Sequence, residues 1–108
     1  MSDHAAQAKR FKAFCDENRL KIIELLQGGE KCACELIEDL DMGQSTLSYH
    51  MKILTESGIV INRQEGKWAH YRISAEGSAE AVAYLQTLTT PKENAGCCTT
   101  GCACEENN

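Results

Sequence analysis

The apolar residues of this chain repeat with a helical period before Gly58 and with a strand period in the fifteen residues that follow it. Before Gly58, the pattern predicts helices over 5–15, 20–26, 33–40 and 45–57. After it, the β-branched run 59–61, a turn at 64–67 and the alternating run 68–73 predict a β-hairpin. A last helical pattern covers 78–89. The order of these periods predicts a mainly α fold with one β-hairpin.

The helices expected at 33–40 and 45–57 are separated only by the turn Asp41-Met42-Gly43. Helix, short glycine-containing turn and helix is the arrangement of a helix-turn-helix motif. Gly58 can close the second helix as a left-handed cap, and the expected hairpin then follows as a wing. We therefore expect a winged helix-turn-helix domain over residues 1–90. The remainder, 91–108, is small, polar and cysteine-rich, and we expect a flexible tail because it has too little apolar surface to fold alone.

Polar side chains share one face of the helix expected at 45–57. Leu47, Met51 and Leu54 fall together on the opposite, apolar side. Hydroxyls, a phenol and a cation on an exposed face suit contacts with base edges and phosphates in a major groove. His50 lies at the edge of the apolar side and fits packing as well as DNA contact. The DNA-contact candidates on this helix are Ser45, Thr46, Ser48, Tyr49, His50 and Lys52, and those in the wing are Arg63 and Lys67, with His70 and Arg72 beside them.

The net charge of −5 is unevenly distributed along the chain. Residues 1–43 hold 6 basic and 9 acidic groups, or −3, and residues 75–108 hold 1 and 5, or −4. Residues 44–74 hold 4 basic and 2 acidic groups, or +2. The positive segment is therefore the one that contains the expected DNA-contact residues, which is where phosphate neutralisation requires it.

Seven cysteines are many for a chain of 108 residues. Their number is odd, and neither a secretory signal nor a membrane-length apolar stretch is apparent, so we expect a cytoplasmic protein. In that compartment, closely spaced cysteines favour metal or metalloid binding. The candidate ligands are Cys32, Cys34, Cys97, Cys98, Cys102 and Cys104, whereas Cys15 fits helix packing better.

Cys32 and Cys34 lie about ten residues ahead of the expected DNA-reading helix. On a regular helix their side chains point about 200° apart, which predicts that they bind one ion only after local unwinding. Unwinding would disturb the helix that supports the DNA-reading helix. Ligand binding and DNA binding should therefore oppose each other.

Three groups of residues resemble the ArsR/SmtB family of winged-helix repressors. They are Phe11-Lys12-Ala13-Phe14 with Arg19-Leu20-Lys21-Ile22, then Ser45-x-x-Ser48-x-His50-Met51-x-x-Leu54-x-x-x-Gly58-Ile59-Val60, and then Arg63-x-x-Gly66-x-x-x-x-Tyr71. The resemblance covers about residues 8–90. It implies a homodimer joined through the helices at 5–15 and 78–89 and bound to double-stranded operator DNA with an imperfect palindrome. Two DNA-reading helices would then lie roughly 34 Å apart, one turn of DNA.

The resemblance also implies a ligand for the thiols. The arsenic-responsive ArsR branch carries Cys-x-Cys-x-x-Cys on this helix, whereas position 37 is Ile here. A tail cysteine, or Cys15, would have to supply the third sulfur. The zinc-sensing branch uses Asp and His on the last helix, and 78–89 contains neither, which favours soft ions. We expect As(III) or Sb(III) as the inducer, with Cd(II) or Pb(II) second.

Three other functions compete with a metalloid-responsive repressor. An arsenate reductase needs a Cys followed by an Arg six residues later, and no Cys here has one, so we expect no enzyme. A metal-storage peptide would account for the tail but not for a winged helix. A thiol-redox repressor, in which Cys32, Cys34 or the tail forms a disulfide, stays open.

Overall fold

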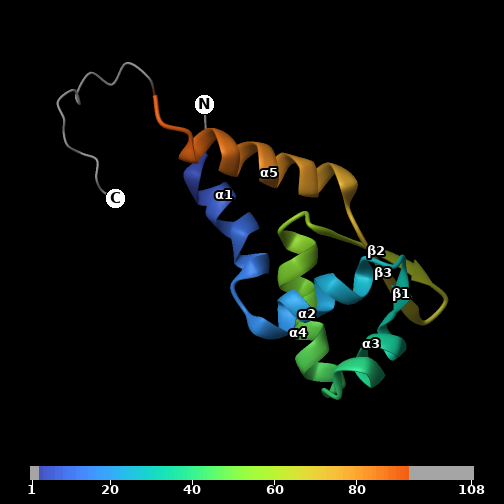
Figure 1. Ribbon diagram of the computed structural model, residues 1–108. Coiled ribbons are helices and arrows are strands. Elements are labelled where there is room, and N and C mark those ends of the chain that lie inside the picture. The colour runs from blue at the N-terminus through green and yellow to red at the C-terminus, as the bar shows by residue number, and fades with distance from the viewer. Residues whose placement is uncertain (1–2, 93–108) are drawn as a thin grey trace.

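The computed structural model describes residues 3–92, and these form five α-helices, a 3-10 turn and a three-stranded sheet (Figure 1). The predicted order of helix, turn, helix and hairpin is confirmed. The tail expected over 91–108 lies outside the described residues, apart from its first two positions. In chain order, the elements are α1 (His4–Phe11), a 3-10 turn (Lys12–Phe14), α2 (Glu17–Leu26), β1 (Lys31–Cys32), α3 (Ala33–Leu40), α4 (Gln44–Glu56), β2 (Val60–Glu65), β3 (Trp68–Ile73) and α5 (Ala75–Thr89).

Side-chain caps and one glycine set several helix boundaries. The Asp16 carboxylate accepts from the Asn18 N–H and begins α2, and the Ser74 hydroxyl accepts from the Gly77 N–H. The Ser74 cap begins α5 three residues earlier than the apolar pattern predicts. Gly58 has a φ of 84°, so the predicted left-handed cap after α4 is confirmed.

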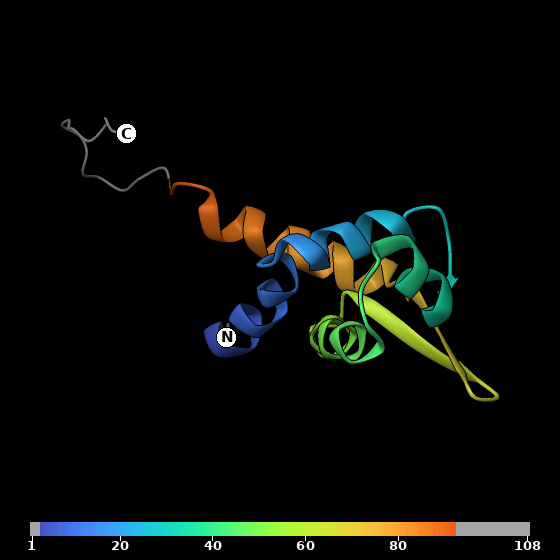
Figure 2. The same ribbon diagram turned by 90° about the horizontal axis from the view of Figure 1, so that it is seen from below.

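The sheet has the strand order β1-β3-β2, and both pairings are antiparallel. β2 and β3 form the predicted hairpin, which projects from the helices as a wing (Figure 2). The sequence does not predict β1, because two residues are too few to show a strand period. β1 joins the sheet by pairing Lys31 with Tyr71 and Cys32 with His70. The thiol segment is therefore attached to the wing.

The core lies where α2, α3 and α4 meet the start of β2. Its largest fully buried side chains are Ile22, Leu36, Leu54 and Ile59, one from each of these parts of the chain. Burial of a side chain of this size stabilises the fold by about 1.5–3 kcal/mol. Because the apolar side of α4 is held in this core, its polar face is directed outward.

α1 and α5 lie against each other on the side of the molecule away from the wing (Figure 1). The Phe11 and Tyr84 rings have centroids 6.0 Å apart, and the Arg10 guanidinium lies 3.0 Å from a Glu80 carboxylate oxygen. Among residues 3–92, no helix combines the length and the apolar character that crossing a membrane requires.

Candidate nucleic-acid interface and thiol site

The exposed face of α4 carries the polar residues that the sequence singles out. Ser45, Thr46, Ser48, Tyr49 and Lys52 are all exposed, while Leu47, Met51 and Leu54 are buried beneath them. A groove of about 280 Å³ separates this face from the wing, and its lining includes Ser48, Lys52 and the wing residue Asn62. The arrangement offers hydroxyls, a phenol and a cation on one projecting helix beside a hairpin. These are the groups that a nucleic-acid groove accepts.

His50 has a different position from its neighbours on α4. Its side chain is only 5% exposed, and its Nδ1 lies 3.1 Å from a guanidinium nitrogen of Arg19 on α2. A guanidinium only donates, so the imidazole Nδ1 is the acceptor in this contact. Arg19 is itself buried and also donates from Nε to the Lys12 carbonyl oxygen. Of the two roles that the sequence leaves open for His50, packing or DNA contact, its burial and its contact with Arg19 favour packing of α4 against α2.

Arg63 in the wing is held by two carboxylates. Its Nε and one terminal nitrogen donate to both oxygens of Glu30 at 3.0 and 2.7 Å, and its other terminal nitrogen donates to Glu65 at 3.0 Å. These hydrogen bonds lower the pKa of Glu30 and raise that of Arg63. In this conformation carboxylates occupy the exposed Arg63 guanidinium, and its predicted contact with DNA stays a prediction. Lys67, at the hairpin turn, is exposed and has no ion-pair partner within residues 3–92.

Replacing Glu30 by Gln is expected to strengthen DNA binding. The change frees the Arg63 fork for a phosphate, so the affinity should rise about fivefold and the salt dependence should steepen by about one charge. Titrations of labelled DNA at several salt concentrations measure both quantities. The matched control is Glu24→Gln, which removes one exposed carboxylate from α2 without touching Arg63. Equal gains from the two variants would mean that only net charge matters.

The two thiols ahead of α3 are in contact. Cys32 is the last residue of β1 and the N-cap of α3, with extended φ and ψ of −76° and 150°, and Cys34 lies in the first turn. Their Sγ atoms are 2.9 Å apart. The expectation that they point about 200° apart is wrong, because Cys32 precedes the helix and does not follow helical geometry. One ion can therefore meet both sulfurs without unwinding α3.

The contact between the two sulfurs affects the acidity of Cys34. The hydrogen bond that the Cys34 thiol donates to Cys32 is the main cause that raises the pKa of Cys34, and desolvation adds to it. The Cys32 N–H donates to the Glu35 carboxylate at 2.8 Å, which fixes the backbone at the helix start. In the sheet, Cys32 of β1 is paired with His70 of β3, and His70 is paired with Arg63 of β2. Cys32 and Arg63 therefore lie on either side of the same residue of β3.

The other expected ligands are not brought to this pair by residues 3–92. Within this range, no group of three or more His, Cys, Asp and Glu side chains is placed to hold a metal ion. Position 37, where the resembling arsenic branch has its third Cys, is a half-buried Ile. Cys15 is exposed, and its thiol donates to the Phe11 carbonyl oxygen at 3.4 Å. Cys97, Cys98, Cys102 and Cys104 lie outside the described residues.

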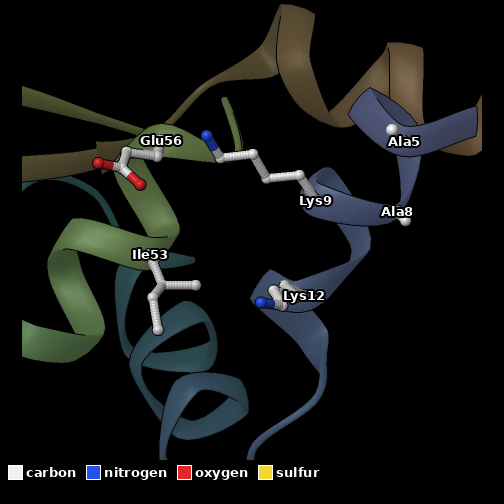
Figure 3. A pocket seen from close by; sticks show the side chains of 6 residues that line it. All are labelled: Ala5, Ala8, Lys9, Lys12, Ile53 and Glu56. Atoms are coloured by element: carbon white, nitrogen blue, oxygen red, sulfur yellow. The ribbon is translucent and has the colours of Figure 1, made fainter. Parts of the chain in front are cut away.

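Two larger cavities lie beside α1, away from the thiol pair. One of about 500 Å³ lies between the N-terminal segment and the end of α4; Lys9 from α1 and Lys12 from the 3-10 turn line it opposite Ile53 and Glu56 (Figure 3). Its described lining holds neither thiol nor imidazole, so we assign it no soft-ion role. The other, about 410 Å³, is an apolar groove between α1 and α5. Its lining includes Phe11, Phe14, Val82 and Leu85, and Leu88 is exposed one turn further on.

Comparison with known proteins places these features in a family. The model of the arsR family of bacterial regulatory proteins matches residues 16–62. The chain is 48% identical over 65 residues to the arsenical resistance operon repressor of Escherichia coli (strain K12), and the match covers 59% of this chain and 56% of that protein. It is 34% identical over 86 residues to the arsenical resistance operon repressor of Staphylococcus aureus, and this match covers 80% of this chain and 83% of that protein.

A solved structure shows the same fold. The homodimeric winged helix-turn-helix DNA-binding domain of a possible ArsR-family transcriptional regulator from Mycobacterium bovis superposes with a TM-score of 0.66 at 30% identity. That match covers 82% of this chain and 86% of the M. bovis domain. The chain therefore belongs to the arsR family of bacterial regulatory proteins, which are transcriptional regulators and not enzymes.

Proposed function

We propose that this protein is a cytoplasmic, DNA-binding transcriptional repressor that leaves its operator when Cys32 and Cys34 bind As(III) or Sb(III). The observation that carries the proposal is the contact between the two thiols, 2.9 Å apart at the junction of the wing and α3. The names of the E. coli and S. aureus relatives support arsenicals as the ligand class. Soft thiolates favour such ions over hard ones.

The proposed DNA partner is a double-stranded operator with an imperfect palindrome, bound by a homodimer. The exposed apolar surface along α5, together with the groove against α1, supplies an interface for a second copy of the chain. The homodimeric M. bovis domain supports this assembly. The proposed DNA contacts are Ser45, Thr46, Ser48, Tyr49 and Lys52 from α4, with Lys67 from the wing.

The route from thiols to DNA runs through the wing and α3 together. β1 ends at Cys32 and is paired with β3, while α3 begins at Ala33 and precedes α4 by a three-residue turn. A ligand that changes the position of Cys32 therefore moves two elements that flank the DNA-reading helix. Shifting a population from about 99% to 1% DNA-competent takes about 5.5 kcal/mol of differential binding. Thiolate sites in small proteins reach about 10 kcal/mol, which is sufficient.

A third sulfur for As(III) is proposed to come from the tail. Trivalent arsenic forms three bonds, and two thiols are present at the site. Cys97, Cys98, Cys102 and Cys104 provide four further thiols within eight positions. Attachment to the same chain raises their effective concentration near the pair.

Replacing both Cys32 and Cys34 by Ser is expected to abolish release by arsenite and to leave DNA affinity within about twofold, since exposed or half-exposed thiols add little to packing. The measurement is polarisation of operator DNA, obtained by selection from a random-sequence pool, titrated with arsenite. Cys15→Ser is the control and should respond like the unmodified protein. Loss of DNA binding in the double variant would show a packing role, and undiminished release would place the sensor elsewhere.

The pH dependence of release separates As(III) from Cd(II) and Pb(II). Ordinary thiols are protonated between about pH 6 and 8, and the hydrogen bond from Cys34 to Cys32 raises the pKa of Cys34 further. Uncharged arsenous acid and thiols yield water, with no net proton release. A divalent cation displaces two protons, so its apparent affinity should rise about 100-fold per pH unit. We expect an arsenite midpoint that is the same at pH 6.5 and 7.5; a hundredfold shift would identify a cation mechanism.

A disulfide between Cys32 and Cys34 is the second candidate switch, favoured by the same short distance between the sulfurs. Two thiols would give up two protons and two electrons to a hydroperoxide, which becomes water and an alcohol. The attacking species is the thiolate, and the raised pKa of Cys34 makes it scarce at neutral pH. Mass spectrometry after peroxide treatment, paired with DNA titration, tests this route. Release by peroxide, with none by arsenite, would select it.

A further inference from the structure

α4 has an open groove on each side of its exposed face. The α4 residues that line the groove of about 280 Å³ toward the wing are Ser48, Met51, Lys52 and Thr55. Toward α1, the cavity of about 500 Å³ is lined by Ile53 and Glu56 of the same helix. At 100° per residue, these two sets lie about 120° apart around α4, with Ser45 between them. In Figure 2, where α4 is seen nearly end-on, the wing extends on one side of it and α1 on the other.

Two grooves that flank a projecting helix match the shape of a DNA duplex. A helix that enters a major groove, which is about 12 Å wide, has one phosphate backbone on each side. On the wing side, the exposed Lys67 is available to the first backbone. The second backbone would then pass through the groove between α4 and α1.

The α1 side of this second groove is suited to an anion. Its lining is Ala5, Ala8, Lys9 and Lys12, which share one face of the N-terminal segment because they are three and four residues apart (Figure 3). The alanine side chains are short and leave the groove open. Both lysines are exposed, and within residues 3–92 neither takes part in an ion pair. With Glu56 opposite, the described lining carries a net charge of +1.

The residues between these lysines have a different role. The Arg10 guanidinium contacts Glu80, and the Phe11 ring lies against Tyr84, so this side of α1 is turned to α5. The proposed dimer also uses the α5 side, where Phe11 lines the apolar groove. The lysine side of α1 is therefore separate from the proposed dimer contact and is turned to the DNA-reading helix.

We propose that Lys9 and Lys12 bind the phosphate backbone of the operator on the side of α4 opposite the wing. Each subunit would then hold both edges of one major groove, with α4 between them. This contact rests on the proposed operator binding and adds the N-terminal segment to the DNA-binding surface. Net charge does not indicate it, since residues 1–43 hold 6 basic and 9 acidic groups. The two cations act through their position beside α4.

The first test measures how DNA affinity depends on salt for full-length Lys9→Gln and Lys12→Gln. Each phosphate contact contributes about 0.9 to the slope of log K against log salt, so a dimer that loses two copies should lose about two units. At 0.1 M salt, we expect each variant to bind selected operator DNA at least about tenfold more weakly. Lys9→Arg and Lys12→Arg keep the charge and should retain both the slope and the affinity.

Lys21→Gln is the matched control. Lys21 is an exposed cation of α2 that is paired with Glu17 and lines neither groove beside α4. Its replacement removes the same charge, and the salt slope should stay within about half a unit of the original. An equal loss of slope in Lys9→Gln, Lys12→Gln and Lys21→Gln would mean that only net charge matters, which overturns the proposed contact.

The second test locates the contact on the DNA. Operators that carry one uncharged methylphosphonate linkage at a time are titrated with the unmodified protein and with the Lys9→Gln/Lys12→Gln double variant. Linkages that weaken binding of the unmodified protein but not of the double variant mark the phosphates that these lysines contact. We expect them across the major groove from the phosphates marked in the same way by Lys67→Gln.

The results separate this contact from the function on which it rests. If the unmodified protein binds operator DNA and the two Gln variants keep its salt slope, the contact is overturned and the proposed repressor stands. Phosphates that coincide with those marked by Lys67→Gln also overturn it, since the lysines would then lie on the wing side. If the unmodified protein selects no DNA sequence, the proposed function itself fails.

Discussion

Replacing Gly77 by alanine is expected to lower the free energy of unfolding by about 3 kcal/mol, the upper range for overpacking a close contact. Gly77 lies in the first turn of α5, and a Cβ there would overlap the carbonyl oxygen of Gly58. Both partners are backbone, so no flexible side chain can move aside. Relief requires the start of α5 to shift from Gly58, which strains the 2.8 Å hydrogen bond that the Ser74 N–H donates to the Ile59 carbonyl oxygen.

Gly28→Ala is the matched control for this substitution. No heavy atom lies within 4 Å of a Cβ built on Gly28, and its φ is not in the left-handed region. Alanine there should be neutral or stabilise by about 0.4–1 kcal/mol, because it restricts the unfolded chain. Urea unfolding at one fixed protein concentration measures both variants. Similar values for the two would mean that α5 does not pack on Gly58 as described.

Replacing Leu85 by Glu is expected to dissociate the proposed dimer and to weaken binding to a palindromic operator by at least about 100-fold. A monomer contacts one half-site at a time and loses the affinity that a dimer gains by binding both half-sites at once. Leu85 is 48% exposed in the single chain and lines the apolar groove with Phe11 and Phe14. A carboxylate placed in such a surface would lose its hydration on association without gaining a partner. Sedimentation analysis and DNA titration give the two readouts.

Gln86→Glu adds the same charge one position along α5, about 100° around the helix. It should leave both the dimer and the DNA affinity nearly unchanged, since Gln86 does not line the apolar groove. A dimeric Leu85→Glu protein would move the interface away from α5. If instead both variants dissociate, general charge repulsion is responsible and this groove is not.

For most residues of α4, the helical period of the sequence predicts correctly which side chains are buried and which are exposed. Leu47, Met51 and Leu54 are buried and Ser45, Ser48 and Lys52 are exposed, as the 3.6-residue period predicts. The same period places His50 only at a boundary, where either role is consistent with the sequence. Its partner Arg19 lies 31 residues away, and no local rule reports that a particular arginine of α2 will be buried beside it. Packing between helices decided the role of His50.

The role of Arg63 in the wing likewise depends on a contact that local sequence pattern does not predict. Arg63 in a hairpin is a reasonable phosphate contact from sequence, because neighbouring positions are polar and the segment is basic. Its bidentate partner Glu30 is 33 residues away, in the loop before β1. That pairing depends on where the loop lies beside β2. Only the fold brings the two groups within hydrogen-bond distance.

What the sequence by itself determined is the main helices and the hairpin, their order, the outward face of α4, the left-handed cap at Gly58 and the presence of two closely spaced thiols before α4. These follow from periodicity, turn residues and side-chain chemistry, which act over a few neighbouring positions. The tertiary structure decided the geometry of the thiols. A two-residue strand takes Cys32 out of the helix, pairs it with His70 and turns its sulfur onto Cys34, because backbone hydrogen bonds to a distant strand override local helical spacing.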